Sequence, residues 1–421
     1  MARYDRIGPL PAPARDQTIP GWPVVLDLED DDRNDELAER VRLRFLALRP
    51  LHRILRSGVE QADHESIRSQ AERLREELGR LHARDRERAV LRAFIDSVKS
   101  MEPERLCGGA LALAEEALRR GHLHGAEEAA RTGLELAEKT GLTQAGSACR
   151  TRLAHVLRAR KDFAAAGEMI EHALAGAEGH PAVRVAAIQE RMRIARASGR
   201  IDDARADADS LADAAERSSD PTLRVLLLSA VADEMMERGD PEAAADHTWR
   251  ALEGAPPAQV AGLLGRLAKS LRHLGMYDEA ERAYEEMSRA DPPSEASTGA
   301  AAEHALMAAC RGAAKEFARR RTSLLEVDAP RGLVTNHLEA QLALGRGCGM
   351  VGNDSCAQQH LATALDLAET LGDAERASEA EALLRALQDG RSAGRLHAEP
   401  VLARPGAAAR RVGAGLVARA H

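Results

Sequence analysis

Aromatic residues are nearly missing from this chain: Phe, Trp and Tyr together make up 2% of its 421 residues. β-Sandwiches and barrels depend on aromatic and β-branched side chains in their strands, so this scarcity disfavours an all-β fold. Hydrophobic residues nevertheless account for 44% of the chain and charged residues for 30%. With many Ala, Leu, Glu and Arg, that composition is typical of a helical protein with a sizeable core.

Long apolar runs and paired cysteines are lacking as well. No stretch approaches 18 uncharged apolar residues, so we expect no transmembrane helix, and the first residues do not resemble a secretory signal. The five cysteines are scattered without a CxxC spacing. We therefore expect small buried thiols in a reducing cytoplasm and no metal site. The net charge of −8 argues against a dedicated nucleic-acid binder.

A periodic glycine is the strongest positive signal. Equivalent positions recur every 36 to 40 residues, and six of the seven are glycine: Gly121, Lys161, Gly199, Gly239, Gly275, Gly312 and Gly352. A glycine can adopt the left-handed conformation that closes a helix, and small residues around it let two antiparallel helices approach closely. Prolines follow the second helix and stop it, at Pro181, Pro221, Pro256, Pro292 and Pro330. Each period is thus predicted to be a helical hairpin that stacks on the next.

These periods resemble the tetratricopeptide repeat (TPR) family over about residues 105–372. The best copy matches the family's pattern at Leu264, Leu267, Ala268, Leu271, Gly275, Tyr277, Ala280, Tyr284 and Pro292. Further copies begin at Leu153 and at Leu344. The resemblance implies an all-α, right-handed α-solenoid of about seven TPR-like hairpins.

Segments outside the array have their own expected roles. Residues 1–33 form a Pro-rich extended arm, and 34–104 form an N-terminal helical cap of about three helices with a break at Pro50. The third cap helix places its apolar side chains on one face: Val90, Leu91, Phe94, Ile95 and Val98. A capping helix is expected over 373–390. The basic tail, 391–421, is expected to be disordered, with contact to an anionic surface as the alternative.

Motifs that would carry chemistry are weak. Residues 347–352 spell GxGxxG, but they close an Ala/Leu-rich helix where a dinucleotide site needs a strand before the glycines. His64 begins an HExxH-like stretch that has Arg68 at the second ligand position, and His122 and His124 lack further nearby ligands. We therefore expect no enzyme activity and no cofactor.

The first helix of each TPR hairpin faces a concave groove, and the resemblance implies the same here. Positions six and three before each reference glycine share one helical face and carry several basic residues. The expected groove residues are His155, Arg158, Arg193, Arg196, Lys269, Arg272 and Arg346. The alternative is that these are ordinary solvated helix charges.

These positions suggest a non-catalytic scaffold that binds a peptide or protein segment. Because the predicted groove residues are mostly basic, they favour an acidic segment. The alternative is a TPR-type sensor of a ligand or peptide that regulates signalling or transcription. Such sensors usually carry an effector domain, for which the only room is residues 35–100.

Overall fold

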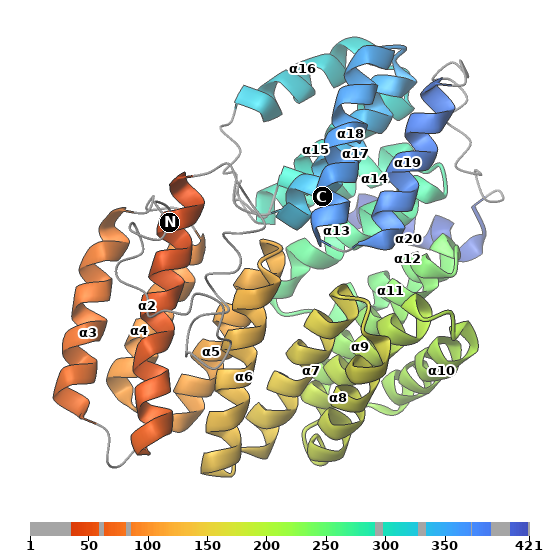
Figure 1. Ribbon diagram of the computed structural model, residues 1–421. Helices are drawn as coiled ribbons and strands as arrows, with labels where there is room; N and C mark the ends of the chain where they lie inside the picture. Colours follow the sequence, from red (N-terminus) through yellow and green to blue (C-terminus); the bar gives the residue numbers. More distant parts are fainter. Residues whose placement is uncertain are drawn as a thin grey trace. The chain divides into compact units, whose positions relative to one another are not determined.

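The computed structural model describes residues 35–58, 63–80, 86–290, 298–326, 334–371, 373–388 and 405–419. Their regular structure is entirely helical, with 19 α-helices, one short 3-10 helix and no strand within these ranges (Figure 1). The chain divides into two compact units, residues 1–198 and 199–421. Among the described residues, no helix combines the length and apolar character needed to cross a membrane. The expected Pro-rich arm, 1–33, lies outside the described residues.

The first unit is a series of helices in which neighbours along the chain pack together. Its α-helices are α2 (Asp35–Ser57), α3 (His64–Glu77), α4 (Arg86–Ser100), α5 (Pro103–Arg119), α6 (Leu123–Thr140), α7 (Thr143–Ala159), α8 (Phe163–Gly176) and α9 (Pro181–Ala197). Leu91, Phe94, Ile95 and Val98 of α4 are buried, as the apolar face predicted. They share one core cluster with Leu106 of α5, so α2–α4 cover the beginning of the hairpin series.

Pro50 does not break a helix, contrary to expectation. It lies inside α2, which continues to Ser57. Proline in a helix interior removes one hydrogen bond and costs about 3 kcal/mol. On either side of it, Ala47, Leu51 and Ile54 are fully buried in the core of the first unit. Their burial offsets the local cost, because burying one such aliphatic side chain contributes about 1.5–3 kcal/mol.

The second unit continues the pattern of sequential helix pairs. Its helices are α10 (Ile201–Arg217), α11 (Pro221–Glu237), α12 (Pro241–Gly254), α13 (Pro257–His273), α14 (Tyr277–Ala290), α15 (Thr298–Cys310), α16 (Ala314–Glu326), α17 (Val334–Met350), α18 (Asp354–Leu371), α19 (Ala374–Gln388) and α20 (Ala407–Arg419). The hairpins are α11/α12, α13/α14, α15/α16 and α17/α18. The single helix α19 packs on α18 with Ala380 buried, at the place where a capping helix is expected. This all-α arrangement is consistent with a helical repeat array.

The reference positions of the repeat lie in the turns between consecutive helices. All seven have positive φ, from 63° at Lys161 to 81° at Gly199. The turn after α13 shows the hydrogen bonds: Met276 N donates to Leu271 O at 3.0 Å, and Gly275 N donates to Arg272 O at 2.9 Å. This pair of bonds satisfies two of the last carbonyl groups of the helix. The predicted left-handed helix ends are therefore confirmed.

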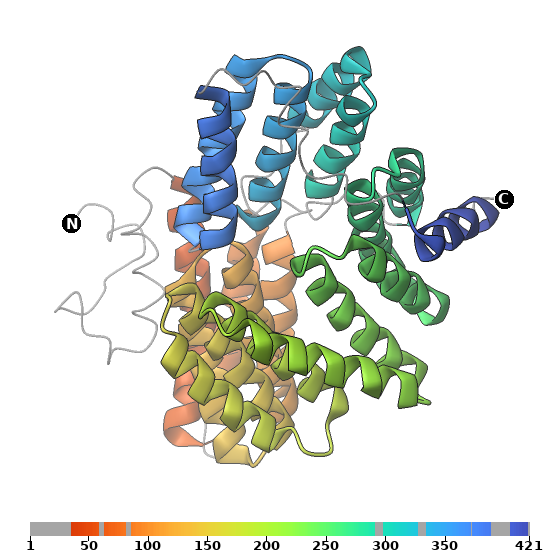
Figure 2. The ribbon, with the colours of Figure 1, turned by 90° about the vertical axis from the view of Figure 1, so that its right-hand side faces the viewer.

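The C-terminal segment differs from the expected disordered tail. Residues 407–419 form α20, which packs against α12 and α14 and appears as the dark blue helix beside the green ones (Figure 2). Ala409, Val412 and Leu416 are buried. Gly415 lies directly against the ring of Trp249, where no β-carbon would fit. The expectation of disorder was thus wrong for 407–419, because three small or aliphatic side chains and one close glycine contact are enough to dock this helix.

Candidate functional site

A charged pocket in the second unit is the candidate functional site. Its volume is about 200 Å³. It is lined by Met236 and Glu237 of α11, Lys269, Arg272 and His273 of α13, Glu303 of α15, Glu339, Leu342 and Arg346 of α17, and Arg376 and Glu379 of α19. The first four of these helices each open a hairpin, and α19 follows the last hairpin. The second helices α12, α14, α16 and α18 contribute none of these residues.

Ion pairs connect the helices that line the pocket. Arg272 Nε of α13 lies 3.2 Å from Glu303 Oε2 of α15, and the two side chains are 3% and 12% exposed. Arg376 Nε of α19 donates to Glu339 Oε1 of α17 at 3.1 Å. Arg346 of α17 pairs with Glu379 of α19. One pair joins two first helices and the other two join α17 to the single helix α19, so these contacts hold the pocket wall together.

Opposite charges are balanced in this pocket. Its lining has four cations of Lys or Arg and four carboxylates. Within the described part of the chain, Lys269 is the one pocket cation without a carboxylate oxygen within 4.0 Å. Its ammonium therefore retains the capacity to pair with a group that enters from outside.

Glu339 remains ionised in this setting. Burial opposes its charge, but Lys269, Arg376 and Arg346 outweigh burial and hold the pKa of the carboxyl below its usual value. Glu339 thus carries a fixed negative charge at pH 7. The pocket offers directed hydrogen bonds and charge pairing to a bound segment.

The structure places six of the seven sequence-predicted groove residues in two groups. Lys269, Arg272 and Arg346 come together in the pocket of the second unit. In the first unit, three others surround Glu190, which is 2% exposed. Arg158 Nε donates to Glu190 Oε1 at 2.6 Å, Arg193 contacts Oε2 at 3.3 Å, and His155 Nδ1 lies 3.7 Å from Oε2.

Arg196, the seventh predicted residue, is half-buried on α9. The sequence predicts either a positive stripe or solvated charges. Neither expectation includes glutamates that pair with these basic residues. Glu190 and Glu303 both lie nine residues before a reference glycine. This is three residues before the earlier of the two groove positions, which lie six and three residues before the glycine. That register position was the signal that could have identified them, because residues three apart share a helix face.

Three of the five cysteines are buried, as the sequence predicted for small thiols, and two are half-buried. Cys107 and Cys149 are buried in the first unit, and burial raises the pKa of their thiols to about 11 and about 12. Cys348 is also buried, whereas Cys310 and Cys356 are half-buried, and all five are free thiols.

Comparison with known proteins adds no family to this geometry. No protein-family model matches the chain. A search of curated proteins finds no match either.

Proposed function

We propose that this chain is a TPR-like interaction protein that binds a peptide or protein segment in the pocket of its first helices and catalyses no reaction. In this proposal the hairpins stack as a right-handed α-solenoid, and the protein acts in the cytoplasm. The observation that carries the proposal is the origin of the pocket: four first helices of hairpins and the single helix α19 supply its whole lining, and the second helices supply none. That is the surface at which TPR proteins bind their partners.

Lys269 determines the chemistry of the segment that fits. Arg272, Arg346 and Arg376 are each paired with a glutamate, so they offer little uncompensated charge to a partner. A run of acidic residues would also meet Glu303, Glu339 and Glu379, and like charges repel at these distances. We therefore expect a segment with one carboxylate that pairs with Lys269, flanked by uncharged or basic residues.

The protonation states in the pocket support a binding role. General acid–base catalysis is most effective when the pKa of the group lies near the working pH. The pKa of Glu339 is lowered, away from neutrality, by Lys269, Arg376 and Arg346 against the effect of burial. The arginines stay charged at all physiological pH values. Glu339 and the arginines are therefore suited to orient a ligand and poorly suited to exchange protons with it.

A charge reversal at Lys269 tests the proposal. The matched control is Lys315→Glu, which changes an exposed lysine on α16, the second helix of its hairpin. Both variants are immobilised beside the parent protein. Proteins retained from an extract of the native cell are identified by mass spectrometry, and peptides tiled along each retained protein are measured for binding. The parent and Lys315→Glu are expected to bind the same single-carboxylate peptide, and Lys269→Glu at least tenfold more weakly.

Binding of the parent should also weaken as salt is raised, because screening reduces exposed charge pairing. Unchanged affinity of the Lys269→Glu variant, with an unchanged circular dichroism spectrum, would show that the pocket is not the binding site.

A further inference from the structure

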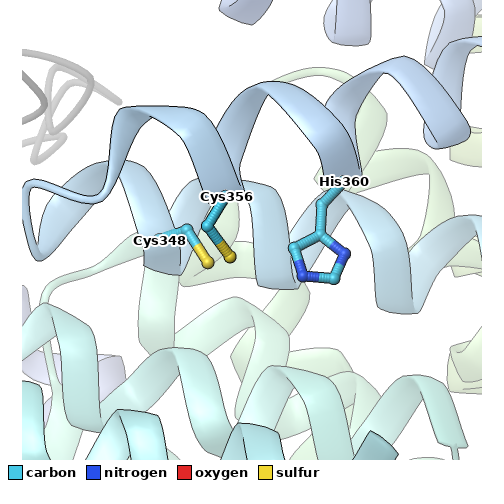
Figure 3. A group of neighbouring side chains, drawn as sticks. All are labelled: Cys348, Cys356 and His360. Atoms are coloured by element: carbon cyan, nitrogen blue, oxygen red, sulfur yellow. The ribbon is translucent and has the colours of Figure 1, made fainter.

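Two thiols and one imidazole come together at the turn of the hairpin α17/α18. Cys348 lies in the last turn of α17, and Cys356 and His360 lie four residues apart on α18. Residues four apart share a face of a helix, and the left-handed turn at Gly352 brings this face back onto α17. Figure 3 shows the two sulfur atoms next to each other and the His360 ring farther along the same side of α18.

The spacing of the three groups suits one small metal ion. The two Sγ atoms and a ring nitrogen of His360 all lie within 4.8 Å of one another. Zinc–sulfur bonds of about 2.3 Å and zinc–nitrogen bonds of about 2.0 Å place tetrahedral ligand atoms about 3.5–3.8 Å apart. Small side-chain rotations close that difference without a change in the backbone.

A glutamine fixes the orientation of the histidine. His360 Nδ1 lies 2.6 Å from Gln341 Oε1, and the amide nitrogen of Gln341 lies 3.2 Å from His337 Nε2. An amide oxygen only accepts hydrogen bonds, so Nδ1 of His360 is the protonated nitrogen. Its Nε2 is left with the lone pair that a metal needs. Metal-binding histidines are commonly held in this way, with the second nitrogen bonded to an oxygen acceptor.

A guanidinium supports the negative charge that the sulfur atoms carry when they bind a metal. Arg321 NH1 of α16 lies 3.3 Å from Cys348 Sγ and also contacts Cys356 Sγ. Arg321 is therefore placed to stabilise the two thiolates of a metal-bound state by charge-assisted hydrogen bonds.

We propose that Cys348, Cys356 and His360 form a zinc site that joins α17 to α18, with a fourth position open to water or an added ligand. Two sulfur ligands and one imidazole favour zinc over magnesium or calcium, which prefer oxygen ligands. Binding of one Zn²⁺ releases one proton from each thiol to solvent and forms two zinc–sulfur bonds and one zinc–nitrogen bond. Cys348 is fully buried and Cys356 is half-buried, so solvent reaches the cluster on the side of Cys356.

A second group of potential ligands does not compete with this one. Glu281, Glu285 and His304 also lie close together. However, Glu281 already pairs with Arg311 and Arg320. Its charge is thus satisfied by two guanidinium groups, and the proposal is restricted to the sulfur-containing cluster.

Metal titration of the full chain tests the proposal. The protein is reduced, freed of metal and titrated with Co²⁺, whose thiolate complexes absorb through sulfur-to-metal charge transfer, and then with Zn²⁺ in competition with a chromophoric chelator. The parent is expected to bind one ion per chain and to show the charge-transfer band. Its Tm should rise by several degrees with zinc.

Matched variants separate this cluster from other thiols. Cys356→Ser and His360→Ala are expected to lower zinc affinity at least about 100-fold, and Gln341→Ala about 10–100-fold, the usual effect of losing a group that orients a ligand. Cys310→Ser removes another half-buried thiol of the second unit and should bind zinc as the parent does.

Two results would overturn the assignment. One is a reduced parent protein without a thiolate charge-transfer band, including the case in which Cys348 and Cys356 form only a disulfide on oxidation. The other is a folded Cys356→Ser variant with parental zinc affinity. The parent's own spectrum decides the question even if a variant fails to fold.

Discussion

Arg158 on α7 donates a hydrogen bond to Glu190 on α9, across 32 residues of sequence, at 2.6 Å. The acceptor is almost completely buried, and Arg193 and His155 lie on its other side. Arg272 and Glu303 repeat this relationship between α13 and α15 in the second unit. Basic residues on one first helix are thus neutralised by a glutamate on the next first helix, and this pairing contributes to the register in which successive hairpins stack.

Replacing Glu190 is expected to destabilise the first unit. In Glu190→Gln the partly exposed Arg158 and Arg193 lose their counter-ion, and losing hydrogen bonds to a charged group costs about 1.5–3 kcal/mol. Urea unfolding measured by circular dichroism gives the change. Glu171→Gln is the control, because Glu171 is 68% exposed and lies 3.5 Å from Arg191. An exposed pair of this kind contributes less than about 1 kcal/mol. Equal effects of both variants would contradict a special role for Glu190.

The contribution of Glu190 and its basic partners to stability should depend on pH. Burial opposes ionisation of Glu190, yet His155, Arg158 and Arg193 together lower the pKa of its carboxyl below 4.5. A lowered pKa means that the native state binds this proton less readily than the unfolded chain does. The stabilising contribution is complete above pH 4.5 and is lost as the pH falls through the folded-state pKa. Unfolding free energy should therefore decline more steeply below pH 4.5 in the parent than in Glu190→Gln, and parallel curves would contradict this.

The repeat register could be predicted from sequence because one backbone requirement recurs. Each hairpin needs a residue with positive φ, and glycine adopts that conformation most easily. The glycine pattern therefore located all seven turns, including the one at Lys161. The paired acids were missed because their partners lie on other helices, so reading one helix face at a time showed only the bases.

Other features depend on contacts that composition does not reveal. The segment 391–421 has few large apolar residues, which is typical of disorder, but α20 docks through glycines that allow close approach to Trp249 and Glu279. Cys348 and Cys356 are separated by seven residues across a turn, a spacing without a familiar metal motif. Only the folded hairpin places their sulfur atoms together.

Docking of α20 can be tested at Gly415. A β-carbon at this position would overlap the ring of Trp249, so Gly415→Val is expected to displace the helix. Val412 and Leu416 would then lose their burial, at a cost of about 1.5–3 kcal/mol for each side chain. Trp249 fluorescence, measured with Trp22 replaced by Phe, reports the exposure of the ring.

The control for this experiment is the neighbouring Ala414→Val, an exposed position with the same new side chain. It should leave the emission of Trp249 unchanged. An unchanged spectrum in Gly415→Val would show that α20 does not pack on α12 as described.

Lys161 offers a gain of stability by a single substitution. It lies in the turn between α7 and α8 with φ of 63°, whereas the six equivalent positions are glycine. A side chain in the left-handed conformation costs about 1 kcal/mol, and the Lys161 side chain is exposed and offsets little of that cost. Lys161→Gly is therefore expected to raise the unfolding free energy by about 0.5–1 kcal/mol, less than the full strain because glycine also increases the entropy of the unfolded chain.

Gly141→Ala in the same unit is the opposite control, since Gly141 has φ of 73° and a β-carbon there would meet nothing within 4 Å. It should lower stability by about 1 kcal/mol through backbone strain alone. Both changes are measured by urea unfolding. If Lys161→Gly proved destabilising, then the lysine side chain would have to stabilise this turn by more than its backbone strain costs.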